Sequence, residues 1–443
     1  MTAENEEARS LIYANSLARL IQKETVSKEK ETDISRFLDF HQVLAEEFPH
    51  IFAVCERETF DGSLLLRWPG EKNAEPVMFM NHHDTVEATG SWKYPPFSGQ
   101  LAEGKVWGRG TLDTKGGLWS MLQAADELAS EGFRPQRDIY FESACNEETT
   151  GQGAQAIARI LAERGVHFSC VFDEGGMIVE EPIGGAHGLF AMVGLGEKGW
   201  ANLRFVAHSS GGHASAPGPD TPLVRLGRFM AEMDDKDPFT GDMSPVVIEM
   251  LRRLAPYMGR QGWFMAHAGT FKKLLCKVMA GMSPTAKAIV KSTLAFTMAG
   301  GSDGFNVLPQ EAWIGGNLRF THHQDLEASL AVIRPIADKH GVEVIVEDGG
   351  LKSGLSDFKA RGFRLMEEAV SRVFPQVKCV VPYIMTGGSD SRYFDKLSDN
   401  CYRFVPFVID QEQMNSIHGL NECVDIATLA PSVAYNKFLM KEL

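Results

Sequence analysis

The sequence lacks long apolar runs, a secretory leader and paired cysteines. No uninterrupted apolar segment in its 443 residues is long enough to span a bilayer, so we expect no membrane partner. The first 20 residues are acidic and helical in pattern, without the basic start and apolar core of a secretory signal. The seven cysteines are scattered and form no close CxxC pair, which is typical of reduced thiols. We therefore expect a cytoplasmic protein.

Basic residues are also scarce relative to acidic ones. Lys and Arg total 44 against 58 Asp and Glu, which gives a formal net charge of -14. Because binding to phosphates needs a basic surface, we expect no nucleic-acid partner. Hydrophobic residues make up 44% and charged residues 23%, as in ordinary globular proteins. A chain of 443 residues exceeds the usual size of one core, so two domains are expected.

What the sequence does contain is three short apolar runs that each lead into metal-binding residue types. In open α/β sheets, ligands bind beyond the carboxyl ends of the strands. Three buried strands that deliver His, Asp and Glu to one edge therefore predict a carboxylate-rich metal site. The runs are Val77–Met80 before His82 and Asp84, Ile139–Phe141 before Glu147 and Glu148, and Cys170–Phe172 before Asp173 and Glu174.

The segment after the first run combines a histidine with an aspartate. His82 and Asp84 are two residues apart, so on an extended segment they point the same way. A neutral His binds zinc and a carboxylate commonly fixes its ring, so Asp84 is expected to support His82. An isolated HHD sequence is more often a surface loop, and we assign His83 to that interpretation.

Asp113 precedes a predicted helix, and an N-cap there is slightly favoured over a bridge between two cations.

The pair Glu147-Glu148 is the sharper signal. Adjacent acids at a strand end project in different directions, so one can bind a metal while the other meets a bound water. A metal lowers the pKa of that water to about 7, and general base catalysis contributes about 10²–10⁴-fold. A Glu-Glu pair alone is more often a solvated turn. The spacing does not decide whether Asp173 or Glu174 is the ligand after the third run. His418 is a single histidine in a predicted loop, which alone is weak evidence for a ligand. The prediction depends on all these features occurring together.

The alternation of helical and strand patterns predicts the domain organisation. Up to about residue 195 the patterns alternate as in a layered α/β domain, and a glycine-rich crossing at Val193–Trp200 follows. Residues 236–300 have helical spacing. We predict an α/β fold in which a catalytic three-layer domain with a mixed sheet (1–197 and 353–443) is interrupted by an inserted α+β lid or dimerisation domain (198–352).

Several segments resemble those of a known enzyme family. The pattern is similar to the di-zinc amidohydrolase family of aminoacylase, acetylornithine deacetylase, succinyl-diaminopimelate desuccinylase and glutamate carboxypeptidase. Within it, the chain most resembles the carboxypeptidase S and N-acyl-amino-acid hydrolase branch, over nearly its whole length. The segments are TVS (25–27), PPFSG (95–99), WGRGTLDTKGG (107–117), NEETTGQGAQ (146–155), DEGG (173–176) and IHGLNE (417–422).

The resemblance implies two zinc ions, with manganese or cobalt tolerated, because two His and three carboxylates suit these cations. It also implies that Asp84 orients His82 and that Glu147 is the general base. The ligands it implies are His82, Asp113 and Asp173 for one ion, and Asp113, Glu148 and His418 for the other.

The resemblance also extends to the substrate-binding residues. His213 matches a family histidine that reaches the developing oxyanion, often across a dimer interface, so a homodimer is expected. Without the resemblance, His213 would be interpreted as a turn histidine. Asn306 and Arg319 match residues that hold the substrate carboxylate, for which Arg has suitable paired donors; otherwise they would be a turn residue and a solvated one. A glycine loop whose backbone lines the substrate pocket, or else a plain turn, is implied at Gly387, Gly388 and Ser389.

The chain departs from the family pattern in three places that carry no ligand. Asn146 replaces an Asp, Thr85-Val86-Glu87 replaces a more apolar run, and Ala214 replaces a Ser. We predict a zinc-dependent amidohydrolase or metallopeptidase that cleaves an amide or peptide bond next to a free carboxylate, in an N-acyl amino acid or short peptide. A dipeptidase or carboxypeptidase of the same chemistry is the first alternative. A non-catalytic amino-acid-binding module is the second, and it is disfavoured because every ligand position is filled.

Overall fold

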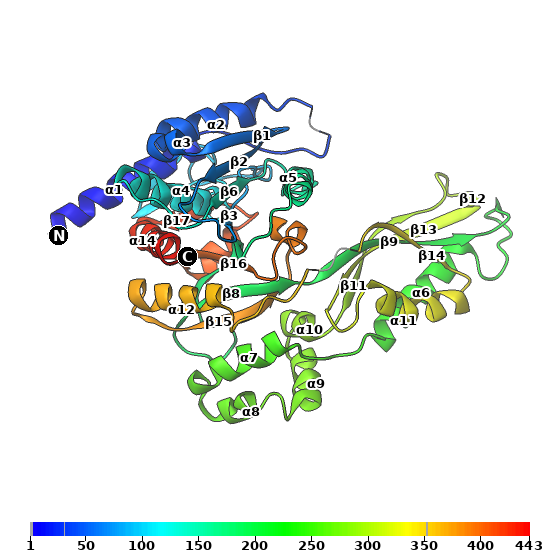
Figure 1. Cartoon of the computed structure of the whole chain (residues 1–443). Helices are drawn as coiled ribbons and strands as arrows, with labels where there is room; N and C mark the ends of the chain where they lie inside the picture. The colour runs from blue at the N-terminus through cyan, green and yellow to red at the C-terminus, as the bar shows by residue number, and fades with distance from the viewer. Residues whose placement is uncertain (1–2, 31, 351–352) are drawn as a thin grey trace.

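The computed structural model describes residues 3–30, 32–350 and 353–443. Figure 1 shows two lobes, of which the larger contains both terminal helices and the smaller is built from the middle of the chain. The α/β fold class is confirmed, because a mixed sheet with helices forms the larger lobe. The domain boundary expected at residue 352 lies outside the described residues, and the proposed division of the chain stays a prediction.

The larger lobe is built on an eight-stranded sheet in the order β1-β2-β6-β3-β7-β16-β8-β15. Strands β6, β3, β7 and β16 run parallel, so their carboxyl ends meet at one edge. Strands β2 and β8, which flank this group of four on its two sides, are antiparallel to it, so the sheet is mixed. The strands are β1 (Glu56–Phe60), β2 (Ser63–Trp68), β3 (Val77–Met80), β6 (Ile139–Ser143), β7 (Cys170–Glu180), β8 (Leu189–Glu197), β15 (Val377–Met385) and β16 (Cys401–Ile409).

Both faces of this sheet are buried, which explains its near-continuous apolar strands. Along β3, Val77 and Phe79 join the core beneath α4 and α14, whereas Met78 and Met80 join the core beneath α5. Helices on both faces give the expected three layers. The helices of this lobe are α1 (Ala3–Ile21), α2 (Ser35–Glu47), α3 (Pro49–Val54), α4 (Lys115–Ser130), α5 (Gln152–Glu163), α12 (Arg361–Val373), η3 (Asp390–Tyr393), α13 (Gln411–Ser416) and α14 (Ile426–Glu442).

The smaller lobe contains a four-stranded antiparallel sheet in the order β11-β13-β9-β14. Burial alternates along β13, and its buried side chains pack with α6 and α11 in a separate core. A two-stranded ribbon of β10 and β12 extends this lobe. Its elements are β9 (Gly199–His208), β10 (Gly212–His213), α6 (Pro222–Lys236), β11 (Thr293–Gly300), β12 (Val307–Leu308), β13 (Glu311–Phe320), α11 (Leu326–Lys339) and β14 (Glu343–Gly349).

Between α6 and β11, the chain forms a helical segment that packs on the larger lobe. Helix α7 lies against β15, and its buried Val246, Met250 and Leu254 belong to the core of the large sheet. None of the helices in the described ranges is long and apolar enough to cross a membrane. The helices of this segment are α7 (Pro245–Leu254), η1 (Ala255–Tyr257), η2 (Gly259–Gln261), α8 (Gly262–Ala266), α9 (Lys272–Met282) and α10 (Pro284–Val290).

A small three-stranded sheet joins two loops that are far apart in the sequence. Strands β4 (Gln100–Ala102), β5 (Lys105–Trp107) and β17 (Cys423–Asp425) pair antiparallel, with Cys423 opposite Trp107. The turn that carries Asp113 follows β5, and the loop that carries His418 precedes β17. Pairing of these strands therefore brings the two loops together.

Candidate metal centre

The carboxyl edge of the large sheet gathers most of the predicted ligands. His82 follows β3, and Glu147 and Glu148 follow the neighbouring parallel strand β6. Asp113 directly precedes Thr114, the first residue before α4, and His418 follows α13 in a left-handed backbone conformation. Loops from four parts of the chain therefore supply one cluster.

Asp113 lies between two histidines. Its Oδ1 is 3.0 Å from His82 Nε2, and its Oδ2 is 3.0 Å from His418 Nε2. The same His418 nitrogen is 3.0 Å from Glu148 Oε2. Ligand atoms of His82, Asp113 and Glu148 all lie within 4.8 Å of one another. One carboxylate that presents an oxygen to each side is the arrangement needed to bridge two cations.

The N-cap interpretation of Asp113 is wrong. The residue that caps α4 is Thr114, and its side chain makes no capping hydrogen bond. The Asp113 carboxylate is directed at the two histidines instead, and their hydrogen bonds, led by that of His418, lower its pKa although burial opposes ionisation. An ionised carboxylate is the form that binds cations.

Asp84 holds both a ligand and the glutamate pair. It is fully buried, and its Oδ1 lies 3.2 Å from His82 Nδ1. The backbone N–H groups of Glu147 and Glu148 donate to its two oxygens at 3.1 Å, and the Ser27 hydroxyl donates at 2.6 Å. Asp84 therefore fixes the His82 ring and also the start of the loop that presents the two glutamates.

The residues present fit divalent cations. Glu148 Oε1 is buried and has no hydrogen-bond partner among the described residues, so it is free to act as a ligand. Burial raises the pKa of Glu147 well above its usual range, and the nearby charges of Asp390 and Glu148 raise it further. Cations bound beside so many carboxyl groups would relieve this repulsion. The donor set of imidazole nitrogens and carboxylate oxygens is one that zinc accepts.

Asp173 is placed differently from the expectation. The strand does not end at this residue, because β7 continues to Glu180 and only its pairing with β3 stops at Phe172. The Asp173 carboxylate accepts hydrogen bonds from the backbone N–H groups of Glu174 and Ser391, each at 2.8 Å. It is therefore turned towards the glycine loop.

Glu174 is the next residue of β7 and is half-buried. Burial raises the pKa of Glu174 well above its usual range, and the negative charge of Asp113 raises it further. The pairing of β7 with β16 is interrupted between Asp173 and Gly176, where the backbone bulges. Both Asp173 and Glu174 stay candidates for the fifth ligand.

His83 points away from His82 but is not on the surface. It is fully buried, with its ring stacked on Phe40 at a centroid distance of 5.3 Å. Its Nδ1 lies 2.9 Å from the Ser143 hydroxyl. The expected surface loop is wrong at this residue, because α2 covers it with aromatic side chains.

A buried ion pair that the sequence analysis did not assign joins two of the ligand loops. Arg109 Nη1 donates to Glu422 at 2.7 Å, and both side chains are almost completely inaccessible. Glu422 also accepts from the N–H groups of Leu112 and Asp113, at 2.8 and 3.1 Å. Arg109 Nη2 in turn donates to the Gly419 carbonyl at 2.7 Å. Arg109 lies in the segment WGRGTLDTKGG and Glu422 in the segment IHGLNE, but neither segment indicates that the two side chains pair.

The predicted glycine loop lies next to Asp173. Gly387 is exposed and Gly388 half-buried, whereas the Ser389 side chain is buried and donates to Glu197 at 2.8 Å. Glu197 is itself paired with Arg403, and neither side chain is accessible. The Ser389 hydroxyl therefore anchors the loop through Glu197, and a role of the loop backbone in substrate binding stays a prediction.

The predicted residues of the smaller lobe are not gathered at the cluster. His213 is exposed on β10, which pairs with β12 at the far end of this lobe (Figure 1), and its Nδ1 accepts from the Ser215 N–H at 3.1 Å. Asn306 is exposed directly before β12. Arg319, near the end of β13, is half-buried; burial and the nearby charge of Arg392 lower its pKa. Arg392 was not predicted, and it lies in the 3₁₀ turn η3 after the glycine loop.

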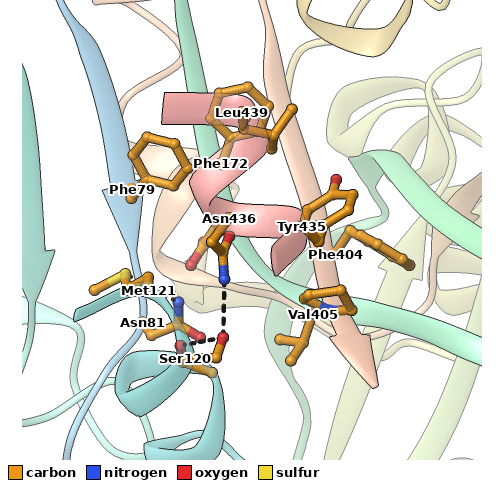
Figure 2. Close-up of a pocket in the computed structure, with 13 residues that line it drawn as sticks. Phe79, Asn81, Ser120, Met121, Phe172, Phe404, Val405, Tyr435, Asn436 and Leu439 are labelled. Carbon is orange, nitrogen blue, oxygen red and sulfur yellow. Dashed lines mark hydrogen bonds between the residues drawn. The ribbon is translucent and has the colours of Figure 1, made fainter. Parts of the chain in front are cut away.

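A small cavity of about 20 Å³ is lined by Asp173 and by residues of β7, α4 and α14 (Figure 2). Figure 2 shows Asn436 of α14 donating to the Ser120 hydroxyl of α4, at 2.9 Å. The Tyr435 hydroxyl is buried beside them without a hydrogen-bond partner among the described residues. This volume suits one water molecule and is too small for a substrate.

The geometry as a whole places the chain in a class. A cluster of histidine and carboxylate suited to divalent cations, at the carboxyl edge of an α/β sheet and beside a half-buried glutamate, is typical of a metal-dependent hydrolase. The sequence matches the peptidase family M20/M25/M40 over residues 78–442, and the protein belongs to this family. The resemblance drawn from the motifs is confirmed.

Relatives and solved structures agree with this assignment. The chain is 30% identical over 414 residues to the N-fatty-acyl-amino acid synthase/hydrolase of Homo sapiens, covering 93% of this chain and 80% of that protein. It is 27% identical over 449 residues to a probable carboxypeptidase S-like protein of Dictyostelium discoideum, covering 97% and 84%.

Two solved structures share the fold. An M20 family metallo-carboxypeptidase from Sulfolobus solfataricus superposes with a TM-score of 0.70 at 14% identity, covering 97% of this chain and 98% of that one. Human carnosine dipeptidase 1 superposes with a TM-score of 0.68 at 12% identity, covering 99% and 98%. The two-lobed arrangement is therefore one that known proteins adopt.

Proposed function

We propose that this protein hydrolyses the amide bond of N-acyl amino acids, next to the free carboxylate. The observation that carries the proposal is Asp113, whose two oxygens face His82 and His418, while the half-buried Glu147 lies next to the ligand Glu148 in the sequence. A relative with 30% identity is named as an N-fatty-acyl-amino acid synthase/hydrolase, which supports this substrate class. Peptide or dipeptide hydrolysis is the second candidate, because another relative is named carboxypeptidase S-like.

The cations are proposed to be two zinc ions, with manganese or cobalt as substitutes. When bound, two such cations polarise a scissile carbonyl and lower the pKa of the attacking water. Asp113 would serve both ions because each of its oxygens already faces one histidine. The proposed ligands are His82, Asp113 and Asp173 for one ion and Asp113, Glu148 and His418 for the other, with Glu174 as the alternative to Asp173.

Glu147 is proposed as the general base. It takes a proton from the water that attacks the carbonyl and returns that proton to the leaving amine. Burial raises its pKa above the usual range, which makes this carboxyl group a stronger proton acceptor than an exposed glutamate. Asp84 holds the Glu147 backbone and the His82 ring, so it positions the base relative to the ligands.

The substrate carboxylate is proposed to bind between the lobes, at Arg319 with the backbone of Gly387 and Gly388. Asn306 lies beside β12 at the far end of the smaller lobe, so it is proposed to reach the substrate carboxylate in the site of a second copy, together with His213. Arg392 supports this placement, because its charge acts on Arg319 and on the carboxyl groups of the cluster. Two guanidinium groups next to the glycine loop would favour a substrate with a free carboxylate over an ester or amide.

His213 is proposed to stabilise the oxyanion in the site of a second copy. Its exposed position at the far end of the smaller lobe supports a homodimer in which each lid reaches the partner. The cytoplasm is the proposed location, supported by seven cysteines that are all free. A non-catalytic binding role has less support, because the chain has side chains suited to a base and to each proposed ligand position.

The test is hydrolysis by the Glu147→Gln variant, assayed on long-chain N-acyl amino acids, N-acetyl amino acids and dipeptides. We expect the wild-type protein to prefer N-acyl amino acids, and the variant to keep its metal while kcat falls about 10²–10⁴-fold. Glu87→Gln is the control, because Glu87 is exposed and near the same loop. Near-normal hydrolysis by Glu147→Gln would exclude the mechanism, and a preference for dipeptides would replace the substrate class.

A further inference from the structure

Charge is distributed very unevenly along this chain. Its formal net charge is -14, yet no Asp or Glu occurs between Met250 and Ser302. This segment covers the helices η1, η2, α8, α9 and α10, together with the end of α7 and strand β11. Its basic residues are Arg252, Arg253, Arg260, Lys272, Lys273, Lys277, Lys287 and Lys291.

Most of these basic residues are paired with acids from outside the segment, but three are not. Arg252 and Arg253 bind Glu249, Lys272 binds Asp242, and Lys287 and Lys291 bind Asp237. The remaining three have no ion pair among the described residues, and all are exposed. These unpaired cations are Arg260, Lys273 and Lys277.

The same stretch exposes large apolar side chains. Trp263 is 58% exposed and Leu274 is 54% exposed. Phe264, Val278 and Met282 are exposed to a similar degree. Singly exposed apolar residues are common, whereas a group of five within 20 residues marks a contact surface.

These side chains form one continuous face. Leu274, Val278 and Met282 recur at every fourth position of α9 and so make a single stripe, with Lys273 and Lys277 beside it. Phe271, at the start of α9, contacts both Trp263 and Phe264 of α8, with ring centroids 5.6 and 5.7 Å apart. We call the exposed apolar side chains and unpaired cations of residues 260–282 the α8–α9 face. It lies at the outer edge of the molecule, away from the terminal helices (Figure 1).

We propose that the α8–α9 face docks the protein onto an anionic lipid surface. Exposed Trp, Phe and Leu flanked by Lys and Arg are the residues that insert at the boundary between headgroups and acyl chains. Charge complementarity selects an anionic surface, because this face carries unpaired cations in a segment without acidic residues, whereas the molecule as a whole is acidic. A peripheral contact needs no spanning helix, so the proposal departs from the expectation of no membrane partner.

The proposal is independent of the proposed catalytic function, since binding is measured without substrate. Full-length protein is sedimented with vesicles of phosphatidylcholine, and with vesicles in which a third of the lipid is phosphatidylserine. We expect binding to the second vesicles only, with an affinity that falls as salt is added. Equal or absent binding to both vesicles at low salt would overturn the proposal.

Two double variants separate the electrostatic and apolar contributions. Lys273→Glu with Lys277→Glu, and Trp263→Ser with Leu274→Ser, should each lower vesicle affinity by about tenfold or more. Lys30→Glu with Lys72→Glu is the matched control, because both lysines are exposed and lie outside the face. Hydrolysis of a soluble N-acyl amino acid should be unchanged in all three. If the two double variants bind vesicles like the wild type, the face does not bind lipid. If they instead change the mass of the protein in solution, the face binds a second copy of the chain.

Discussion

His41 and His83 place two imidazole rings in the core between α2 and the large sheet, with centroids 5.2 Å apart. Burial lowers the pKa of His41 to about 4 from its ordinary value of 6.5. The folded protein therefore takes up this proton only at a lower pH than the unfolded chain does. The stability that the neutral ring contributes is complete above pH 6.5 and is lost as the pH falls through about 4.

The lowered pKa of His41 predicts that the folded protein loses stability in acid, and that substituting His41 reduces this loss. The free energy of unfolding of the wild-type protein should fall by up to about 3 kcal/mol between pH 7 and pH 4 because of His41. In His41→Leu that part of the pH dependence should vanish. Urea unfolding at several pH values measures it, with His167→Gln, an exposed histidine, as the control. Parallel pH profiles for wild type and His41→Leu would contradict the assignment.

Single residues also show what the sequence could and could not predict. His82 and Glu148 could be found because the loops that carry them follow β3 and β6, which are neighbouring parallel strands of one sheet, so local order fixes where they meet. The pairing of Arg109 with Glu422 could not be deduced, because 313 residues separate them and only the folded chain brings them together. His83 was misplaced for a related reason, since the helix that covers it is not visible in the local sequence.

At the scale of elements, the first turn of α4 must approach the loop that carries His82 closely. A Cβ added at Gly117 would lie 2.0 Å from Asn81 Oδ1, which itself accepts a hydrogen bond from the Thr114 hydroxyl. The two glycines after Lys115 thus allow this helix to pack against the ligand loop. This explains why a glycine is needed inside a helix that would otherwise be weakened by it.

Gly117→Ala should therefore displace the Asn81 side chain and lower the free energy of unfolding by about 1–3 kcal/mol. Gly227→Ala is the matched control, because Gly227 lies in α6 with no atom within 4 Å of the added Cβ. That control should be neutral or stabilising, by up to about 1 kcal/mol. Equal effects of the two substitutions in chemical unfolding would mean that the close contact does not matter.

Strands with a fully apolar pattern could be predicted within a few residues. The run Val77–Met80 coincides with β3, and the run Ile139–Phe141 extends to Ser143 in β6. The exception is β7, which runs on past Asp173 to Glu180. Its polar and glycine residues indicated an end of the strand, but continued pairing with β16 and β8 overrides that local signal.

At the scale of the whole molecule, the metal cluster and His213 lie on different lobes. If His213 serves the site of a second copy, two inactive variants should complement each other. Glu147→Gln and His213→Ala subunits, mixed in equal amounts, give heterodimers in which one site has both wild-type residues. Activity should then return to about a quarter of the wild-type level, because half of the dimers contain one intact site. Activity no higher than that of the separate variants would assign His213 to its own chain.

The two-lobed arrangement could be predicted from sequence, but the packing of its parts could not. The helices after α6 were expected in the inserted domain, whereas α7 packs on β15 and shares the core of the large sheet. Periodicity reports which face of a helix is apolar and not which sheet covers it. The same limit hid the α8–α9 face, whose apolar stripe has the same sequence pattern as a buried one.

The central claim is that side chains from separate loops hold two cations around Asp113. The most direct measurement is a calorimetric zinc titration of chelated protein, with elemental analysis of the product and hydrolysis assayed at each point. The account predicts two zinc ions per chain in the wild type and in Glu147→Gln, with activity recovered only in the wild type. His418→Ala should bind at least one ion fewer or bind it far more weakly. Full activity in the chelated protein, or saturation with no bound zinc, would contradict it.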